Sequence, residues 1–242
     1  MKLSMKRVLI ACLLIVAAGT LGAQRLTIAS GAGYRALVDE LSAMFEAETG
    51  ITVEKIYGNM GVVTTQARSS GVVDIVIGDK SFFDGVKLPF KDEFILGRGR
   101  LVLAGAKGVG TVSLDLLTAP KTKRIAFPDS KVAIYGIAAE EYLKNSGLKK
   151  KVESKLIQVG TVPQVSAYLL SGEVDLGFIN LTDAMVIRNK IEGYVEVPAT
   201  LYSPIYIVAR SLPEAPSSDA ALRFGRFLEK TEVRAVVEKH GL

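Results

Sequence analysis

The stretch SSGVVDIVIGD, residues 69–79, contains an apolar run from Val72 to Gly78 that only Asp74 interrupts. Such a run is typical of a strand that is buried on both faces, as in a parallel sheet. The residues before it predict strands and helices in alternation: a strand at 25–30, a helix at 35–50, a strand at 51–58 and a helix at 62–70. This order predicts the opening of a doubly wound α/β fold.

The same unit returns in the second half of the chain as LSGEVDLGFIN, residues 170–180. Both stretches have the form S-G-x-V-D followed by an apolar strand, and the two strands end at Asp79 and Asn180. Around the second unit we expect strands at 124–129 and 155–160 and helices at 136–147 and 162–173. Ligands of open α/β sheets bind beyond the carboxyl ends of the strands. Two such units therefore predict two similar lobes that face one cleft, with Asp79 and Asn180 pointing into it.

The chain should pass twice between these lobes. Residues 94–108 predict a pair of strands that leaves the first lobe, and residues 202–210 predict a strand that returns to it. One or two helices follow at 219–241. We expect the following division: residues 25–104 and 203–242 in the first lobe, residues 105–202 in the second, and hinge strands near 103–107 and 201–205.

The first 23 residues have the layout of a secretory signal peptide. A positive head of Lys2, Lys6 and Arg7 precedes an apolar run from Val8 to Ala18, and small residues favour cleavage after Ala23. The apolar run is well short of the roughly 20 residues that a membrane-spanning helix needs. We therefore predict an exported protein that is located in the periplasm.

Charge and rare residues exclude several classes of function. Without residues 1–23 the chain has 27 basic and 25 acidic residues, a net charge of +2, which gives no dense basic face for nucleic acid. Cys12 is the only cysteine and falls in the predicted signal peptide, where it also allows a less favoured lipoprotein interpretation. His240, near the end of the chain, is the only histidine. Thiol nucleophiles, histidine metal sites and Ser-His-Asp catalysis are thus excluded, and we expect a monomeric protein that is not an enzyme, without cofactor or metal.

Long stretches of the chain resemble a known family. They are IASGAGYRALVDELSAMFEAETGITVEKIYGNMG (28–61), VVDIVIGDKSFFD (72–84), LVLAGAKG (101–108), VPQVSAYLLSGEVDLGFINLTDA (162–184) and FGRFLEKTEVRAVVEKHGL (224–242). In order and spacing the chain resembles the periplasmic substrate-binding proteins of ABC importers, and more narrowly the molybdate- and tungstate-binding family. The resemblance implies a two-lobe fold of type II-like form, each lobe a mixed sheet flanked by helices, and a membrane permease as partner.

The resemblance also implies a binding site. The family holds a tetrahedral oxyanion with hydroxyl groups and with backbone N–H groups at helix N-termini, where free donors and the helix dipole favour an anion. Five places in this chain match the family's contacts: the loop SGAGY, the loop GNMG, the stretch VAIYG, the helix start at Thr161-Val162 and the residue before LTDA. The ligand-binding residues implied are Ser30, Ala32, Gly33, Tyr34, Asn59, Met60, Gly61, Ala133, Tyr135, Val162 and Asn180.

The chain departs from the family at several of these places. The family's first loop has a serine at the helix entry, and here Gly33 lies near that place and Ser30 slightly before it. The family's second loop is Gly-Ser-Ser-Gly, and Asn59 and Met60 replace both serines here, while Asn180 replaces a tyrosine. A lost donor at a buried anion costs about 1.5–3 kcal/mol. Asparagine can donate through its amide, whereas the thioether of Met60 is soft and polarisable and donates nothing. We expect capture of a molybdate- or tungstate-type oxyanion. The alternative is another anion, a small organic acid or a metal species, for uptake or for presentation to a membrane sensor.

Overall fold

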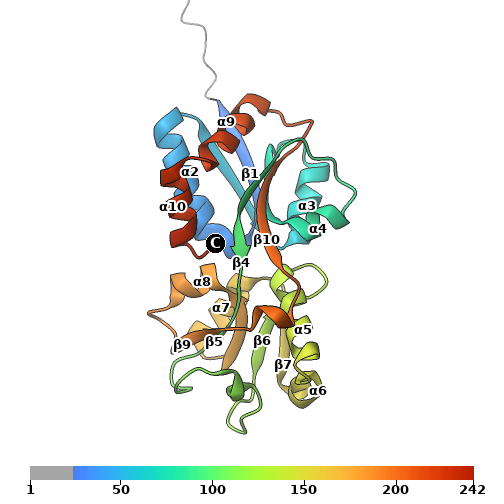
Figure 1. Ribbon diagram of the computed structural model, residues 1–242, viewed down its shortest axis with the longest axis vertical. Coiled ribbons are helices and arrows are strands. Elements are labelled where there is room, and N and C mark those ends of the chain that lie inside the picture. The colour runs from blue at the N-terminus through green and yellow to red at the C-terminus, as the bar shows by residue number, and fades with distance from the viewer. Residues whose placement is uncertain (1–23) are drawn as a thin grey trace, which may run out of the picture.

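The computed structural model describes residues 24–242, and the predicted signal peptide lies outside them. Two five-stranded sheets form two lobes that follow one another along the long axis of the molecule (Figure 1). The strand order is β2-β1-β3-β10-β4 in the first sheet and β7-β6-β8-β5-β9 in the second. The strands are β1 (Arg25–Gly31), β2 (Thr52–Gly58), β3 (Ile75–Asp79), β4 (Glu93–Gly99), β5 (Leu101–Gly105), β6 (Ile125–Pro128), β7 (Leu156–Val159), β8 (Leu176–Asn180), β9 (Gly193–Glu196) and β10 (Ile205–Ser211).

Helices cover both faces of each sheet. In the first lobe α2 and α10 lie on one side of the sheet and α3 and α4 on the other (Figure 1). The helices are η1 (Ala32–Tyr34), α2 (Arg35–Thr49), α3 (Met60–Ser69), α4 (Lys80–Gly85), η2 (Leu114–Leu117), α5 (Ile134–Asn145), α6 (Lys149–Val152), η3 (Glu153–Lys155), α7 (Val162–Ser171), α8 (Leu181–Ile187), η4 (Ala199–Leu201), α9 (Ser218–Leu228) and α10 (Thr231–Lys239). The α/β two-lobe fold predicted from the sequence is confirmed. Across residues 24–242 no helix has the length and apolar character that a membrane crossing requires.

The two S-G-x-V-D units have the same structure in both lobes. Gly71 and Gly172 follow α3 and α7 with φ of 67° and 73°, the left-handed conformation in which glycine ends a helix without strain. The strands that follow, β3 and β8, are buried at every residue and pair in parallel with β1 and β6. The predicted double burial of both strands is therefore confirmed.

The aspartate of each unit joins its strand to the neighbouring parallel strand. Asp74 donates its N–H to the Thr27 carbonyl (2.9 Å), and its carboxylate accepts the N–H groups of Thr27 (2.8 Å) and Ser217 (2.6 Å). Asp175 makes the corresponding pair of bonds with Arg124, donating to its carbonyl (3.0 Å) and accepting its N–H (2.9 Å). The motif thus fixes the start of the central parallel pair in each lobe.

The predicted strand pair at 94–108 is wrong in one respect. β4 and β5 do not pair with each other: β4 pairs with β10 in the first sheet, and β5 pairs with β8 and β9 in the second. The chain therefore crosses between the sheets at Arg100 rather than after residue 104, and the predicted hinge stretch 103–107 begins inside β5. The return crossing lies between β9 and β10, and β9 was not predicted because its four residues carry no marked apolar pattern. We propose a lobe boundary at residue 100.

We expect Asp74→Ala to lower the free energy of unfolding by about 2–3 kcal/mol, because two backbone N–H groups lose a buried acceptor. Asp175→Ala should cost less, about 1 kcal/mol, because Asp175 is half-exposed and water can replace it, whereas Asp74 is buried. Urea unfolding followed by circular dichroism measures both values. Glu214→Ala, at an exposed loop position, is the control and should change little. An equal loss in all three variants would contradict the role assigned to the motif.

Candidate functional site

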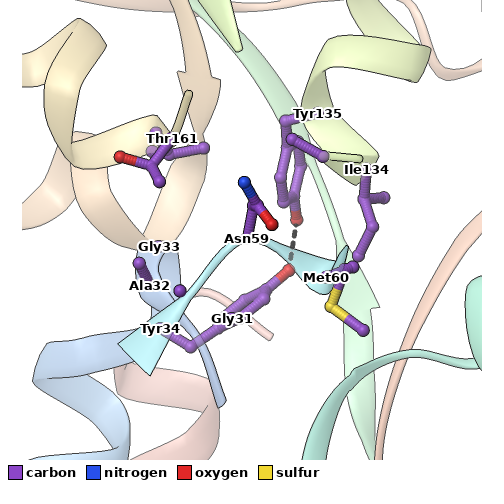
Figure 2. Close-up of a pocket in the computed structure, with 12 residues that line it drawn as sticks. Gly31, Ala32, Gly33, Tyr34, Asn59, Met60, Ile134, Tyr135 and Thr161 are labelled. Carbon is purple, nitrogen blue, oxygen red and sulfur yellow. Dashed lines mark hydrogen bonds between the residues drawn. The ribbon is translucent and has the colours of Figure 1, made fainter. Parts of the chain in front are cut away.

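A small cavity lies between the two lobes, with a volume of about 30 Å³. The first lobe contributes the ends of β1 and β2 and the helix starts that follow them, and the second lobe contributes the starts of α5 and α7 (Figure 2). The residues that line it are Gly31, Ala32, Gly33, Tyr34, Gly58, Asn59, Met60, Ala133, Ile134, Tyr135, Thr161 and Val162. No charged side chain is among them.

Four helix N-termini meet at this cavity. They begin at Ala32, where η1 runs directly into α2, at Met60 in α3, at Ile134 in α5 and at Val162 in α7. The first N–H groups of a helix have no partner within the helix, and the macrodipole places partial positive charge there. This arrangement favours an anion through backbone groups rather than through lysine or arginine.

Asn59 and Met60, which stand where the family has two serines, both make hydrogen bonds within the protein. The Asn59 Oδ1 accepts the N–H of Val62 (3.0 Å) and caps α3, while its Nδ2 donates to the carbonyl of Gly160 across the cleft at 3.4 Å. The Met60 N–H donates to the carbonyl of Val132 at 2.9 Å. One of the helix-start donors expected for a ligand is thus used by the second lobe.

The thioether of Met60 forms an apolar part of the cavity wall. The Met60 side chain is buried and packs over Gly78 in β3, where a Cβ atom would lie 2.5 Å from the Met60 Cε. Gly78 therefore leaves the space that the thioether occupies. A flexible, unbranched side chain at this place can move to change the volume of the cavity.

Tyr34 and Tyr135 come from different lobes and meet at the cavity wall. Their hydroxyl oxygens lie 2.6 Å apart in a hydrogen bond (Figure 2), and both side chains are buried. Burial raises the pKa of both phenols well above the usual value for tyrosine. Both hydroxyls therefore keep their protons at neutral pH, so the pair adds no negative charge to the site.

Most of the residues implied by the family resemblance lie on this cavity. Eight line it: Ala32, Gly33, Tyr34, Asn59, Met60, Ala133, Tyr135 and Val162. Four lining residues were not predicted, namely Gly31, Gly58, Ile134 and Thr161. Each is a direct sequence neighbour of a predicted residue, so extending each predicted contact by one position would have included them.

Three predicted residues do not line the cavity. Ser30 is fully buried in β1, and its hydroxyl donates to the carbonyl of Gly31 at 3.3 Å. Gly61 is the second residue of α3, where a Cβ atom would face Val132 rather than open space. Asn180 is fully buried, and its Nδ2 donates to the carbonyl of Gly33 at 2.9 Å. Ser30 thus packs within the first lobe, Gly61 faces Val132 of the second lobe, and Asn180 contacts the first lobe directly. A ligand contact by these residues stays a prediction.

A second, larger cavity of about 170 Å³ lies beside the first and shares Ile134 with it. Its walls include the carboxylates of Asp79 and Glu141, from different lobes. Asp79 accepts the Phe82 N–H (2.8 Å) and caps α4, as expected for a polar residue that ends β3, and Glu141 accepts from Ser203. Two carboxylates make this cavity unsuitable for an anion. Within the described chain no three His, Cys, Asp or Glu side chains are grouped as a metal site would need.

Comparisons with known proteins agree with this geometry. The sequence model of the family described as bacterial extracellular solute-binding protein matches residues 26–242. The molybdate-binding protein ModA of Rhodobacter capsulatus is 26% identical over 219 residues, which cover 88% of this chain and 86% of that protein.

Two solved structures share the fold. The periplasmic molybdate-binding protein of Azotobacter vinelandii superposes with a TM-score of 0.80 at 23% identity, over 89% of this chain and 97% of that one. The sulfate-binding protein SubI of Mycobacterium tuberculosis superposes with a TM-score of 0.68 at 13% identity, over 90% and 86%. The family model covers both lobes and every residue that lines the small cavity. The chain therefore belongs to the family of bacterial extracellular solute-binding proteins.

Proposed function

We propose that this protein captures a small oxyanion of the molybdate or tungstate type in the cavity between its lobes and delivers it to the permease of an ABC importer. One observation carries the proposal: four helix N-termini converge on a cavity that has no charged side chain among its lining residues. Backbone N–H groups at helix starts bind anions without a cation. The name of the Rhodobacter relative, a molybdate-binding protein, supports the same ligand class.

The mechanism is capture without covalent chemistry. The lobes close on the ligand, and the donors are the backbone N–H groups at the helix starts Ala32, Ile134 and Val162, all of which line the cavity. Closure then creates the two-lobe shape that a membrane permease can recognise. Export through cleavage of residues 1–23 would place the protein in the periplasm, where such an importer collects its solute.

The walls of the cavity also favour a second candidate class, a less strongly hydrated anion or a small organic acid. The side chains of Met60, Ile134 and Val162 on the cavity wall are apolar and offer a hard oxyanion no hydrogen-bond donor. The cavity volume of about 30 Å³ is only about twice the roughly 10–15 Å³ that a cavity needs to hold one water molecule. A ligand with four oxygens therefore requires the Met60 thioether or the lobes to move.

A thermal-shift panel tests the ligand class. A ligand that binds only the folded state raises the melting temperature, by an amount that corresponds to about 2.7 kcal/mol at 100 times its Kd. We expect molybdate or tungstate to raise it at low millimolar concentration, and sodium chloride at equal ionic strength to have no effect. A rise with acetate, lactate or another organic acid alone would replace the oxyanion by the second candidate class.

Substitution at Ala133 tests whether the ligand is an anion. Ala133 lies on the cavity wall and is the N-cap of α5, a position that favours both aspartate and asparagine. Ala133→Asp should leave the fold intact and weaken molybdate binding at least about 100-fold, because two like charges repel strongly in a partly buried site. Ala133→Asn, of the same shape but neutral, is the matched control and should bind far better in calorimetry. Equal binding by the two variants would exclude an anionic ligand at this cavity.

A further inference from the structure

Several hydrogen bonds join the two lobes directly around the small cavity. The Asn180 Nδ2 of the second lobe donates to the Gly33 carbonyl of the first (2.9 Å), and the hydroxyls of Tyr34 and Tyr135 bond across the cleft (2.6 Å). The backbone N–H of Met60 donates to the carbonyl of Val132 (2.9 Å). Each bond joins two groups of the protein itself.

Asn180 has the environment of a contact between lobes rather than of a ligand contact. It follows the buried strand β8, and its side chain is fully buried and does not line the cavity. The Cβ that Gly33 lacks would lie 3.1–3.3 Å from the amide atoms of Asn180, so the amide packs directly on the Gly33 backbone. Gly33 belongs to the turn whose N–H groups face the cavity. Asn180 therefore holds this turn against the second lobe.

The tyrosine pair is sheltered from solvent in the same way. Tyr34 is 2% and Tyr135 4% exposed, so water competes little for their bond. Gly99, the last residue of β4, lies against the Tyr135 hydroxyl, where a Cβ atom would collide with it. The absence of a side chain at Gly99 in the first lobe thus leaves room for the Tyr135 hydroxyl of the second lobe.

We propose that Asn180, Tyr34 and Tyr135 form a latch that stabilises the closed arrangement of the lobes, and that Asn180 is a positioning residue rather than a ligand contact. A ligand that binds only the closed form has its apparent affinity reduced by the fraction of protein that is closed. The latch raises this fraction before any ligand arrives. The proposal depends on the two-lobe architecture but not on the identity of the ligand.

Spin labels across the cleft test the latch without any ligand. In a Cys12→Ser background no cysteine remains, so Thr65→Cys on α3 and Lys144→Cys on α5 provide unique exposed labelling positions in different lobes. Pulsed electron resonance then measures the distance distribution between the two labels. The latch variants are Asn180→Ala, Tyr34→Phe, Tyr135→Phe and the double Tyr34→Phe/Tyr135→Phe. Tyr142→Phe is the matched control, because Tyr142 is a buried tyrosine of the same helix α5 that packs against Phe178 inside the second lobe.

We expect a short, narrow distance distribution in the unsubstituted protein. Losing one latch bond should raise the ratio of open to closed protein roughly 2- to 13-fold, the range that a single hydrogen bond supports. The double tyrosine variant should open no further than either single variant, because both remove the same bond. The Tyr142→Phe control should keep the short distance, and circular dichroism should show that all variants are folded.

Other outcomes overturn the latch. A ligand-free protein that is mainly open before substitution, or latch variants whose distances match the Tyr142→Phe control, would show that these bonds do not hold the lobes together. If Asn180→Ala weakens molybdate binding while the ligand-free distances stay unchanged, Asn180 is a ligand contact instead. If no variant binds molybdate but the latch variants still open as expected, the proposed ligand is rejected and the latch is supported.

Discussion

The central parallel strands of each lobe end at the same edge of their sheet, and this constraint sets the position of nearly everything else. In a parallel arrangement each strand feeds a helix that starts at that edge, so the N-termini of successive helices lie together. The starts of α2 (through η1) and α3 in the first lobe face those of α5 and α7 in the second. Asp74 and Asp175 keep the register of the two central pairs through equivalent reciprocal bonds. The cavity is a consequence of this shared edge.

A site built from helix starts has a particular chemistry. It presents N–H groups and partial positive charge in a volume lined by no charged side chain, so it can hold an anion without an ion pair. The two tyrosines keep their protons because both are buried. In the larger cavity Glu141 accepts from Ser203 and the Asp79 Oδ1 accepts the Phe82 N–H, whereas the buried Asp79 Oδ2 has no partner among the described residues. The two neighbouring cavities therefore differ in electrostatic character, and only the smaller suits an oxyanion. Met60 then determines how much room that anion has.

The replacements at Asn59, Met60 and Asn180 have structural explanations. Asn59 caps α3, Met60 fills the space that Gly78 leaves, and Asn180 bonds the Gly33 carbonyl of the other lobe. All three positions thus contribute to contacts within or between lobes. In this chain the groups that hold the lobes together lie beside the groups that face the ligand, which connects affinity with closure.

The amino-acid sequence by itself determined the class of fold, because the two S-G-x-V-D units, the buried apolar strands and the glycine helix ends are local patterns whose period and order are visible in one dimension. Its resemblance to a known family also implied eight of the residues that line the cavity. Only the tertiary structure decided that β4 and β5 belong to different sheets, that Ser30 and Gly61 do not line the cavity, and that Asn180 contacts the opposite lobe. These features depend on which residues meet across the cleft, and contacts between residues more than a hundred positions apart leave no periodic signal in the chain.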